Sequence, residues 1–372
     1  MRAKRRPREM APMQSATPAK RRIALALQGG GSHGAFTWGV LDRLLQEPDY
    51  EIVGISGASA GAMNAGILAD GLRRGGAAQA RVALRRYWED VGCLPGFASF
   101  APPAFAAGER VWNLDQNPLF IWHDLLTRFW SPYQTNPLNH NPLRKLLERI
   151  DFDGLRRDTE GARVFISATN VRTGLRRLFQ NAELTVEALL ASACLPQVYQ
   201  AVEIEGEHYW DGGYTGNPAL APLYLRTTAS DVIVVGINPI ERAGLPQSAR
   251  GIIDRIDEIS FNSTFMLELA AIAFVEKLVG SGVETRGFRS LFLHDISDEA
   301  LGSLGASSKM NNHPDFLRHL HAMGLRAAER WLEEHRDAVG KRSTLDLSGL
   351  VPPPGGRMTG PSVIREKQEL AA

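Results

Sequence analysis

Short apolar runs alternate with helix-spaced apolar positions along most of this chain. The runs predict strands over 23–27, 51–56, 164–169, 176–179, 198–205, 231–237 and 291–294. Apolar residues spaced three and four positions apart predict helices over 35–45, 60–72, 77–91, 249–279 and 314–339. Strands that alternate with helices are typical of α/β proteins. We therefore predict an α/β fold with a mostly parallel central sheet flanked by helices.

The same pattern separates one large domain, 23–340, from two polar ends. Residues 1–22 carry eight basic residues and one acid, which predicts a disordered basic tail. Large apolar residues also thin out near the other end, and we predict a flexible tail over 341–372. Within the domain, residues 97–133 hold nine aromatic residues and several prolines. We interpret this segment as a lid or inserted binding loop, with a satellite hydrophobic cluster as the alternative.

Composition narrows the class of protein. The chain is 44% hydrophobic and 22% charged with a formal net charge of +1, which is typical of a globular protein and argues against a nucleic-acid partner. Two cysteines cannot form a disulfide framework, and no stretch resembles a membrane span or a secretory signal. We expect a cytoplasmic protein. Its basic tail is interpreted either as a solvated leader with no role or as an arm that makes peripheral contact with an anionic membrane. The pattern does not indicate an oligomeric state.

A glycine-rich loop follows the first predicted strand. The loop, Gly29-Gly30-Gly31-Ser32-His33-Gly34, opens a helix, so its amides can converge and hold negative charge. Its spacing also matches dinucleotide-binding loops, but those folds place an acid at the end of the next strand. This chain has Ser56 and Gly57 there. We therefore favour an anion-binding loop over a nucleotide site.

A candidate nucleophile follows the second predicted strand. Gly57-Ala58-Ser59-Ala60-Gly61 has the small residues that a strand-to-helix nucleophile elbow requires around its serine. A serine hydroxyl also needs a base. The later histidines lie on or near a predicted strand or helix rather than in a catalytic loop: His294, His313, His319, His321 and His335. Asp211 is the better partner, because Asp211-Gly212-Gly213 follows a strand-turn-strand pattern centred on Glu205 and Gly206.

Taken in order, the three motifs resemble those of the patatin-like phospholipase family over about residues 23–238. Further local matches lie at Ala35–Leu41, Ala191–Pro196 and Gly216-Asn217-Pro218. The resemblance implies a catalytic dyad without histidine, in which Ser59 is the nucleophile and Asp211 is the base. It implies an oxyanion hole formed by the loop residues Gly29, Gly30 and Gly31, and we expect a positive φ at Gly30. The remaining motif glycines support this assignment: Gly34, Gly57, Gly61, Gly212 and Gly213.

The function implied by the resemblance is lipid acyl hydrolysis, in which carboxylic esters are cleaved through an acyl-serine intermediate with no metal or organic cofactor. Two positions depart from the plant members, which have Asp and Arg where this chain has Gln28 and His33. The departure at His33 removes the expected basic side chain beside the loop. Two alternatives stay open: a general carboxylesterase acting on small or polymeric esters, and a non-catalytic protein that binds acyl lipids. Head group, acyl position and chain length are not encoded in any of these motifs.

Overall fold

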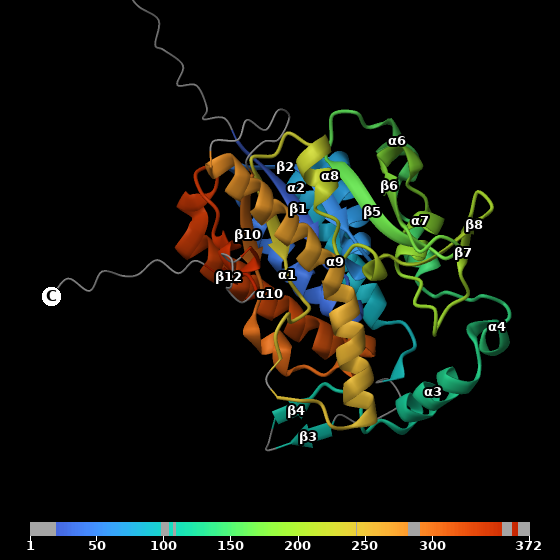
Figure 1. Cartoon of the computed structure of the whole chain (residues 1–372). Helices are drawn as coiled ribbons and strands as arrows, with labels where there is room; N and C mark the ends of the chain where they lie inside the picture. The colour runs from blue at the N-terminus through green and yellow to red at the C-terminus, as the bar shows by residue number, and fades with distance from the viewer. Residues whose placement is uncertain are drawn as a thin grey trace, which may run out of the picture.

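A mixed sheet at the centre of the molecule carries the candidate site (Figure 1). The computed structural model describes residues 20–97, 104–106, 109–242, 244–281, 291–351 and 359–363. Eight strands form this sheet in the order β10-β9-β1-β2-β5-β8-β7, with β6 also paired to β5. Their bounds are β1 Arg21–Leu27, β2 Tyr50–Gly57, β5 Arg163–Asn170, β6 Arg176–Gln180, β7 Val202–Ile204, β8 Glu207–Asp211, β9 Asp231–Val235 and β10 Phe292–Ile296.

Most of the sheet is parallel, as the sequence predicts. Neighbours from β10 through β9, β1 and β2 to β5 pair in parallel, whereas β6 and β8 pair antiparallel to β5, and β7 pairs antiparallel to β8.

The helices are α1 Gly34–Leu44, α2 Ala60–Gly92, α3 Pro118–Phe129, α4 Pro132–Thr135, α5 Arg144–Leu147, α6 Phe152–Arg157, α7 Val186–Ser192, α8 Ala221–Arg226, α9 Ala249–Gly280 and α10 Pro314–His335.

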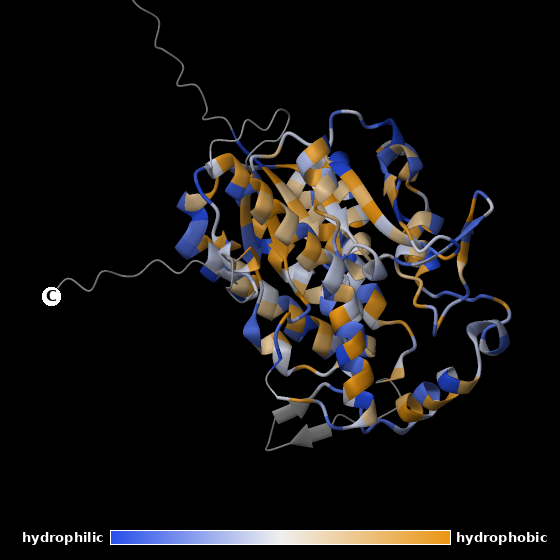
Figure 2. Ribbon diagram, viewed as in Figure 1, coloured by the Kyte–Doolittle hydropathy of each residue, from blue (hydrophilic) through white to orange (hydrophobic). Residues whose placement is uncertain are grey.

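Helices cover both faces of the sheet and bury its apolar strands (Figures 1 and 2). Successive side chains of β1 point to opposite faces, as the pleat requires. Ile23, Leu25 and Leu27 join the core formed with α1, α2 and α10. Ala24 and Ala26 face the second core, to which α8 and α9 contribute. Because both faces of the sheet are covered, the central strands have continuous runs of apolar residues rather than alternating apolar and polar residues.

Several element boundaries differ from those that the pattern predicts. The strand expected over 198–205 is limited to β7, and a β-turn at Glu205 and Gly206, whose φ angles are 54° and 79°, joins it to β8. Helices expected over 60–72 and 77–91 form α2, which is broken at Gly75 and Gly76. The segment 97–133 contains α3 and two short strands, β3 Ala104–Ala106 and β4 Glu109–Val111, and continues into α4.

The predicted ends of the domain also need correction. Arg21 and Arg22 begin β1, while residues 1–19 lie outside the described residues. At the other end, the prediction of a flexible tail from residue 341 is wrong for its first part. Leu345, Leu347 and Leu350 are buried in the second core, and a short pair is formed by β11 Leu345–Asp346 and β12 Ser362–Val363. None of the helices in the described part of the chain is both long and apolar enough to cross a membrane.

A buried carboxylate ties this C-terminal segment to the sheet edge. Asp231 Oδ1 accepts hydrogen bonds from His294 Nε2 at 2.9 Å and from the Gly340 amide at 2.8 Å. His294 Nδ1 lies 3.1 Å from Thr344 Oγ1. Burial by itself would raise the pKa of Asp231, but the hydrogen bonds from His294, Gly340 and Ser230 hold it below its usual range. His294 therefore has a structural role, since it binds Asp231 at the start of β9, the end of the sheet opposite the candidate site.

We predict that Asp231→Ala lowers the free energy of unfolding by about 3 kcal/mol at pH 7, because it leaves buried His294 and the Gly340 amide without their acceptor. The pKa of Asp231 is depressed on folding, so its stabilising effect is present above the ordinary aspartate pKa near 3.9 and is lost as the pH falls below it. Urea unfolding at pH 7 and at pH 3.5 measures both effects. The exposed residue Asp337 supplies the control Asp337→Ala; equal stability of both variants would contradict the assignment.

Candidate active site

The candidate site lies where β1 and β2 end side by side. The two strands are in parallel register, with Leu27 opposite Gly57, so the glycine loop and the serine turn that follow them are neighbours. On the other side, Gly57 pairs with Ile166 of β5. Two residues further along β5, Ala168 pairs with Asp211 of β8. Since Ser59 is also two residues beyond Gly57, the sheet register brings Ser59 and Asp211 to the same level.

Ser59 occupies a strained turn between β2 and α2. Its φ of 52° and ψ of −123° lie in a region that residues other than glycine rarely adopt. The turn is held by the Ser59 amide, which donates to Ser192 Oγ at 2.9 Å and to the Ser192 carbonyl at 3.1 Å. Such a turn presents the serine side chain at the N-terminus of the following helix, as a nucleophile elbow does.

Asp211 ends β8 with its carboxylate fully buried. Oδ1 accepts a hydrogen bond from the Gly213 amide at 2.7 Å, whereas Oδ2 has no hydrogen-bond partner among the described residues. The Asp211 amide donates to the Cys194 carbonyl at 2.8 Å. The segment at the end of α7 therefore fixes both candidate residues, Ser59 through Ser192 and Asp211 through Cys194.

Burial sets the protonation of this carboxyl group. It raises the pKa of Asp211 to about 7, and hydrogen bonds from the Gly213 amide and the Ser59 hydroxyl only partly oppose the increase. Of these two opposing influences, the Gly213 amide has the larger effect on the pKa and the Ser59 hydroxyl the smaller one. A carboxyl group with a pKa near neutrality is a much better proton acceptor than an exposed aspartate, whose pKa is near 3.9.

The glycine loop packs against the serine turn with no room for side chains. A Cβ on Gly29 would lie 2.6 Å from both the Ala58 carbonyl oxygen and Ser59 Cβ. The Gly29 amide donates to Asn217 Oδ1 at 2.6 Å. This amide is therefore not free to bind an oxyanion, which corrects the expectation that Gly29, Gly30 and Gly31 would all contribute. In the described part of the molecule, the amides of Gly30 and Gly31 donate to no protein acceptor.

The positive φ expected at Gly30 occurs one residue later. The φ of Gly30 is 167°, outside the left-handed region, whereas Gly31 has a φ of 57°. A Cβ on Gly31 would also lie 2.3 Å from the Lys309 carbonyl oxygen. Gly31 is thus the loop position where both the backbone angle and the close approach require glycine. The other motif glycines also meet close neighbours; a Cβ would approach backbone atoms within 2.5 Å at Gly57, Gly61 and Gly212, and side chains within 2.7 Å at Gly34 and Gly213.

His33 packs in the core behind the loop. Its Nε2 lies 2.7 Å from Ser308 Oγ, and its ring contacts Phe316 edge-on. Burial lowers the pKa of His33 to about 3, with Lys309 adding to the effect, so the ring is neutral at physiological pH. His33 therefore does not supply the positive charge that is missing at its position. Three of the later histidines lie on α10, and His313 immediately precedes it.

Four supporting residues were not assigned roles from the sequence. Ser192 and Asn217 lie within motifs that drew attention only as local matches, and a search for side chains able to bond the two turns could have singled them out. Asn238 donates through Nδ2 to the Gly29 carbonyl at 2.7 Å, and Lys309 Nζ donates to Asn238 Oδ1 at 2.8 Å. No sequence signal connects Lys309 with the loop, because their contact depends on the packing of distant segments.

Comparison with known proteins identifies the family. A model described as patatin-like phospholipase matches residues 25–224, which is more than half of the chain. The chain therefore belongs to the patatin-like phospholipase family, which implies a lipid acyl hydrolase. Among solved structures, VipD from Legionella pneumophila is similar to this chain with a TM-score of 0.35 and 14% sequence identity, over 82% of this chain and 67% of VipD. The chain matches none of the curated proteins.

We predict that Asp211→Asn gains stability relative to the wild type as the pH rises. Because folding raises the pKa of Asp211 to about 7, ionisation of the wild-type carboxyl group opposes folding above the ordinary pKa. The difference in unfolding free energy should shift by about 4 kcal/mol in favour of Asn between pH 4 and pH 8. Urea unfolding at pH 4, 6 and 8 measures this shift. A difference that is independent of pH would mean that the carboxylate is not desolvated.

Proposed function

We propose that the protein hydrolyses carboxylic acyl esters of lipids through a Ser59-Asp211 dyad. The observation that carries the proposal is that the sheet register brings a strained serine, at the start of α2, to the level of a buried aspartate whose pKa is raised to about 7. Asp211 accepts the Ser59 proton as the hydroxyl oxygen attacks the ester carbonyl. The tetrahedral oxyanion forms beside the amides of Gly30 and Gly31, where each donor contributes about 3 kcal/mol.

The second half of the reaction uses the same groups. The proton held by Asp211 passes to the departing alkoxide, which leaves as an alcohol, and Ser59 stays acylated. Asp211 then takes a proton from a water molecule, whose oxygen attacks the acyl-serine carbonyl. Collapse of the second oxyanion breaks the ester bond to Ser59 and releases a carboxylic acid, while the proton returns to the serine oxygen. Every proton transfer thus runs through Asp211, which exchanges protons with Ser59, the leaving alcohol and water.

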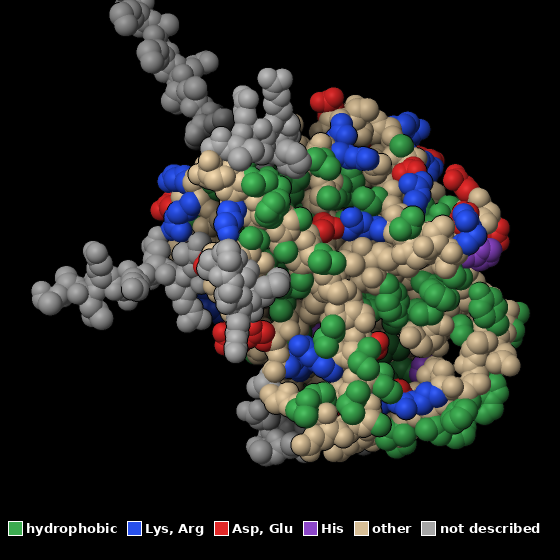
Figure 3. Space-filling view, in the orientation of Figure 1, with side chains coloured by type: hydrophobic (Ala, Val, Ile, Leu, Met, Phe, Trp, Pro, Cys, Tyr) green, Lys and Arg blue, Asp and Glu red, His purple; other side chains and the backbone are tan. Residues whose placement is uncertain are grey.

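The surface near the site supports a lipid substrate over a small soluble ester. One stripe of α3 exposes large apolar side chains, with Trp122 61%, Leu125 49% and Phe129 73% exposed. Hydrophobic side chains gather along the α3 and α4 edge, and the surface is hollowed between this edge and α9 (Figure 3). Exposed aromatic residues suit acyl chains and the membrane interface. We propose that this stripe receives the acyl chain or contacts an anionic membrane.

We predict that a fluorophosphonate probe labels the wild type and not Ser59→Ala, and that Ser59→Ala and Asp211→Asn each lose ester hydrolysis by at least about 1,000-fold. The kcat/KM of the wild type should rise with pH and level off above an apparent pKa near 7, because Asp211 must be ionised to act as the base. Ser263→Ala, at an exposed serine on α9, is the matched control. Retention of most activity by Ser59→Ala or Asp211→Asn would contradict the dyad.

The apolar stripe gives a separate prediction that distinguishes a lipid hydrolase from a general carboxylesterase. Replacing Trp122, Leu125 and Phe129 together with alanine should leave kcat/KM for short-chain esters unchanged and lower it progressively for longer acyl chains. Each buried methylene contributes about 0.8 kcal/mol only where an apolar wall receives it. Val82→Ala, at an exposed apolar residue on α2, is the control. Equal losses at every chain length would favour a purely structural role.

A further inference from the structure

A hydrogen-bonded chain connects the ammonium group of Lys309 to the glycine loop. Lys309 Nζ donates to Asn238 Oδ1 at 2.8 Å, and Asn238 Nδ2 donates to the Gly29 carbonyl oxygen at 2.7 Å. Asn238 is held in place by Gln28, whose Oε1 accepts the Asn238 amide at 3.0 Å. A lysine more than 270 residues distant in the sequence thus acts on the loop through a single intervening side chain.

The chain ends on the peptide group that joins Gly29 to Gly30. The Gly29 carbonyl and the Gly30 N–H belong to the same peptide unit, so a donor bound to the carbonyl withdraws electron density from the N–H. Hydrogen bonds in such a chain strengthen one another, and a charged donor at the head of the chain strengthens them further. The Gly30 amide, which donates to no acceptor among the described residues, is therefore both oriented and polarised.

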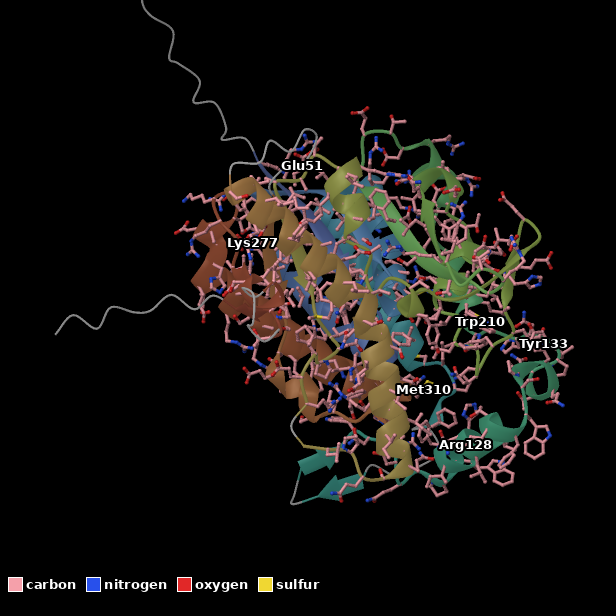
Figure 4. All side chains as sticks on the ribbon, in the orientation of Figure 1. Glu51, Arg128, Tyr133, Trp210, Lys277 and Met310 are labelled. Atoms are coloured by element: carbon pink, nitrogen blue, oxygen red, sulfur yellow. The ribbon has the colours of Figure 1, made fainter. Side chains whose placement is uncertain are left out.

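Backbone packing fixes the position of Lys309 independently of this chain. Lys309 lies in a 3-10 turn, Ala306–Met310, that packs on the 3-10 turn Gly31–His33. The contact is close enough that a Cβ on Gly31 would lie 2.3 Å from the Lys309 carbonyl oxygen. In the view of Figure 4, Met310 and Trp210, the chain neighbours of Lys309 and Asp211, lie between α9 and α4.

We propose that Lys309, acting through Asn238, is a positioning residue that orients and polarises the Gly30 amide for oxyanion binding. This inference rests on the proposed acyl hydrolysis. Lys309 supplies the positive charge that the neutral ring of His33 lacks. This charge acts on the oxyanion indirectly, by polarising the Asn238 amide and the Gly29-Gly30 peptide group. Its contribution is largest in the transition state, where the negative charge on the carbonyl oxygen develops.

The electrostatic surroundings of Lys309 determine its pH dependence. Burial lowers the pKa of its ammonium group, and the acids of α9 only partly oppose this. The other charged and titratable groups around Lys309 are Glu258, Asp254 and Asp257 of α9, Arg242 of the loop after β9, and His33. Glu258 is already paired with Arg242 and Arg255. Lys309 should therefore lose its proton at a lower pH than an exposed lysine, and the amide chain then loses its charged donor.

The test compares three variants with the wild type in kcat, KM and pH profile on a soluble p-nitrophenyl ester. Lys309→Met should lower kcat about tenfold with little change in KM, because it removes a transition-state interaction. The wild type should lose activity at alkaline pH as Lys309 deprotonates. Lys309→Arg should retain most of the activity and remain active at that pH, because arginine stays protonated. Lys277→Met, at an exposed lysine at the far end of α9, is the matched control (Figure 4).

A second variant keeps the test decisive if Lys309→Met does not fold. Asn238→Asp preserves the shape of the side chain and its contact with Lys309 but cannot donate to the Gly29 carbonyl, so it should also lower kcat about tenfold. If the wild type is active and kcat is unchanged in Lys309→Met or Asn238→Asp, the role proposed for Lys309 is wrong, while the proposed function still stands. An alkaline decrease that persists in Lys309→Arg would also overturn that role. A wild type that is neither labelled by fluorophosphonate nor active on any ester would overturn the proposed function itself.

Discussion

The close approach of two backbone turns, one at Gly29 and one at Ser59, is the constraint on which the rest of the site depends. Parallel pairing of β1 with β2 brings both turns to the carboxyl ends of neighbouring strands, and a Cβ on Gly29 would clash with Ser59 Cβ at 2.6 Å. The approach is possible because Gly29 lacks a side chain. It explains why two glycine-rich motifs recur in one short stretch of sequence.

The role proposed for Asp211 and the stability of the fold oppose each other. Burial that raises the pKa of the carboxyl group to about 7 also makes its ionised form unfavourable in the folded protein. Ser59 adds a second unfavourable element, since its backbone occupies a region that other residues avoid. Hydrogen bonds from rigid neighbours hold both groups in place, through Ser192 and Cys194 at the end of α7. The surrounding sheet and helices therefore supply the stability that the site itself lacks.

The site extends beyond the part of the chain that matches the family model. Residues 25–224 contain both candidate dyad residues, the loop and Asn217. Asn238 and Lys309, which complete the hydrogen bonding of the loop, lie further along the chain. The later segments also cover the second face of the sheet with α9 and fasten its edge through Asp231 and His294. The supports of the candidate site therefore come from both halves of the sequence.

The sequence by itself determined the fold class and the candidate residues, because both leave local signals. Apolar runs mark buried strands, and a nucleophile turn or an anion-binding loop needs small residues at fixed spacing. Two predictions from the sequence were wrong: the positive φ was expected at Gly30 and lies at Gly31, and the Gly29 amide was expected to be a free donor. The path of a glycine-rich loop depends on what packs against it. Only the tertiary structure decided that Asp211 is fully buried and that Lys309 reaches the loop through Asn238. Desolvation and contacts between distant segments arise from packing, and no spacing along the chain records them.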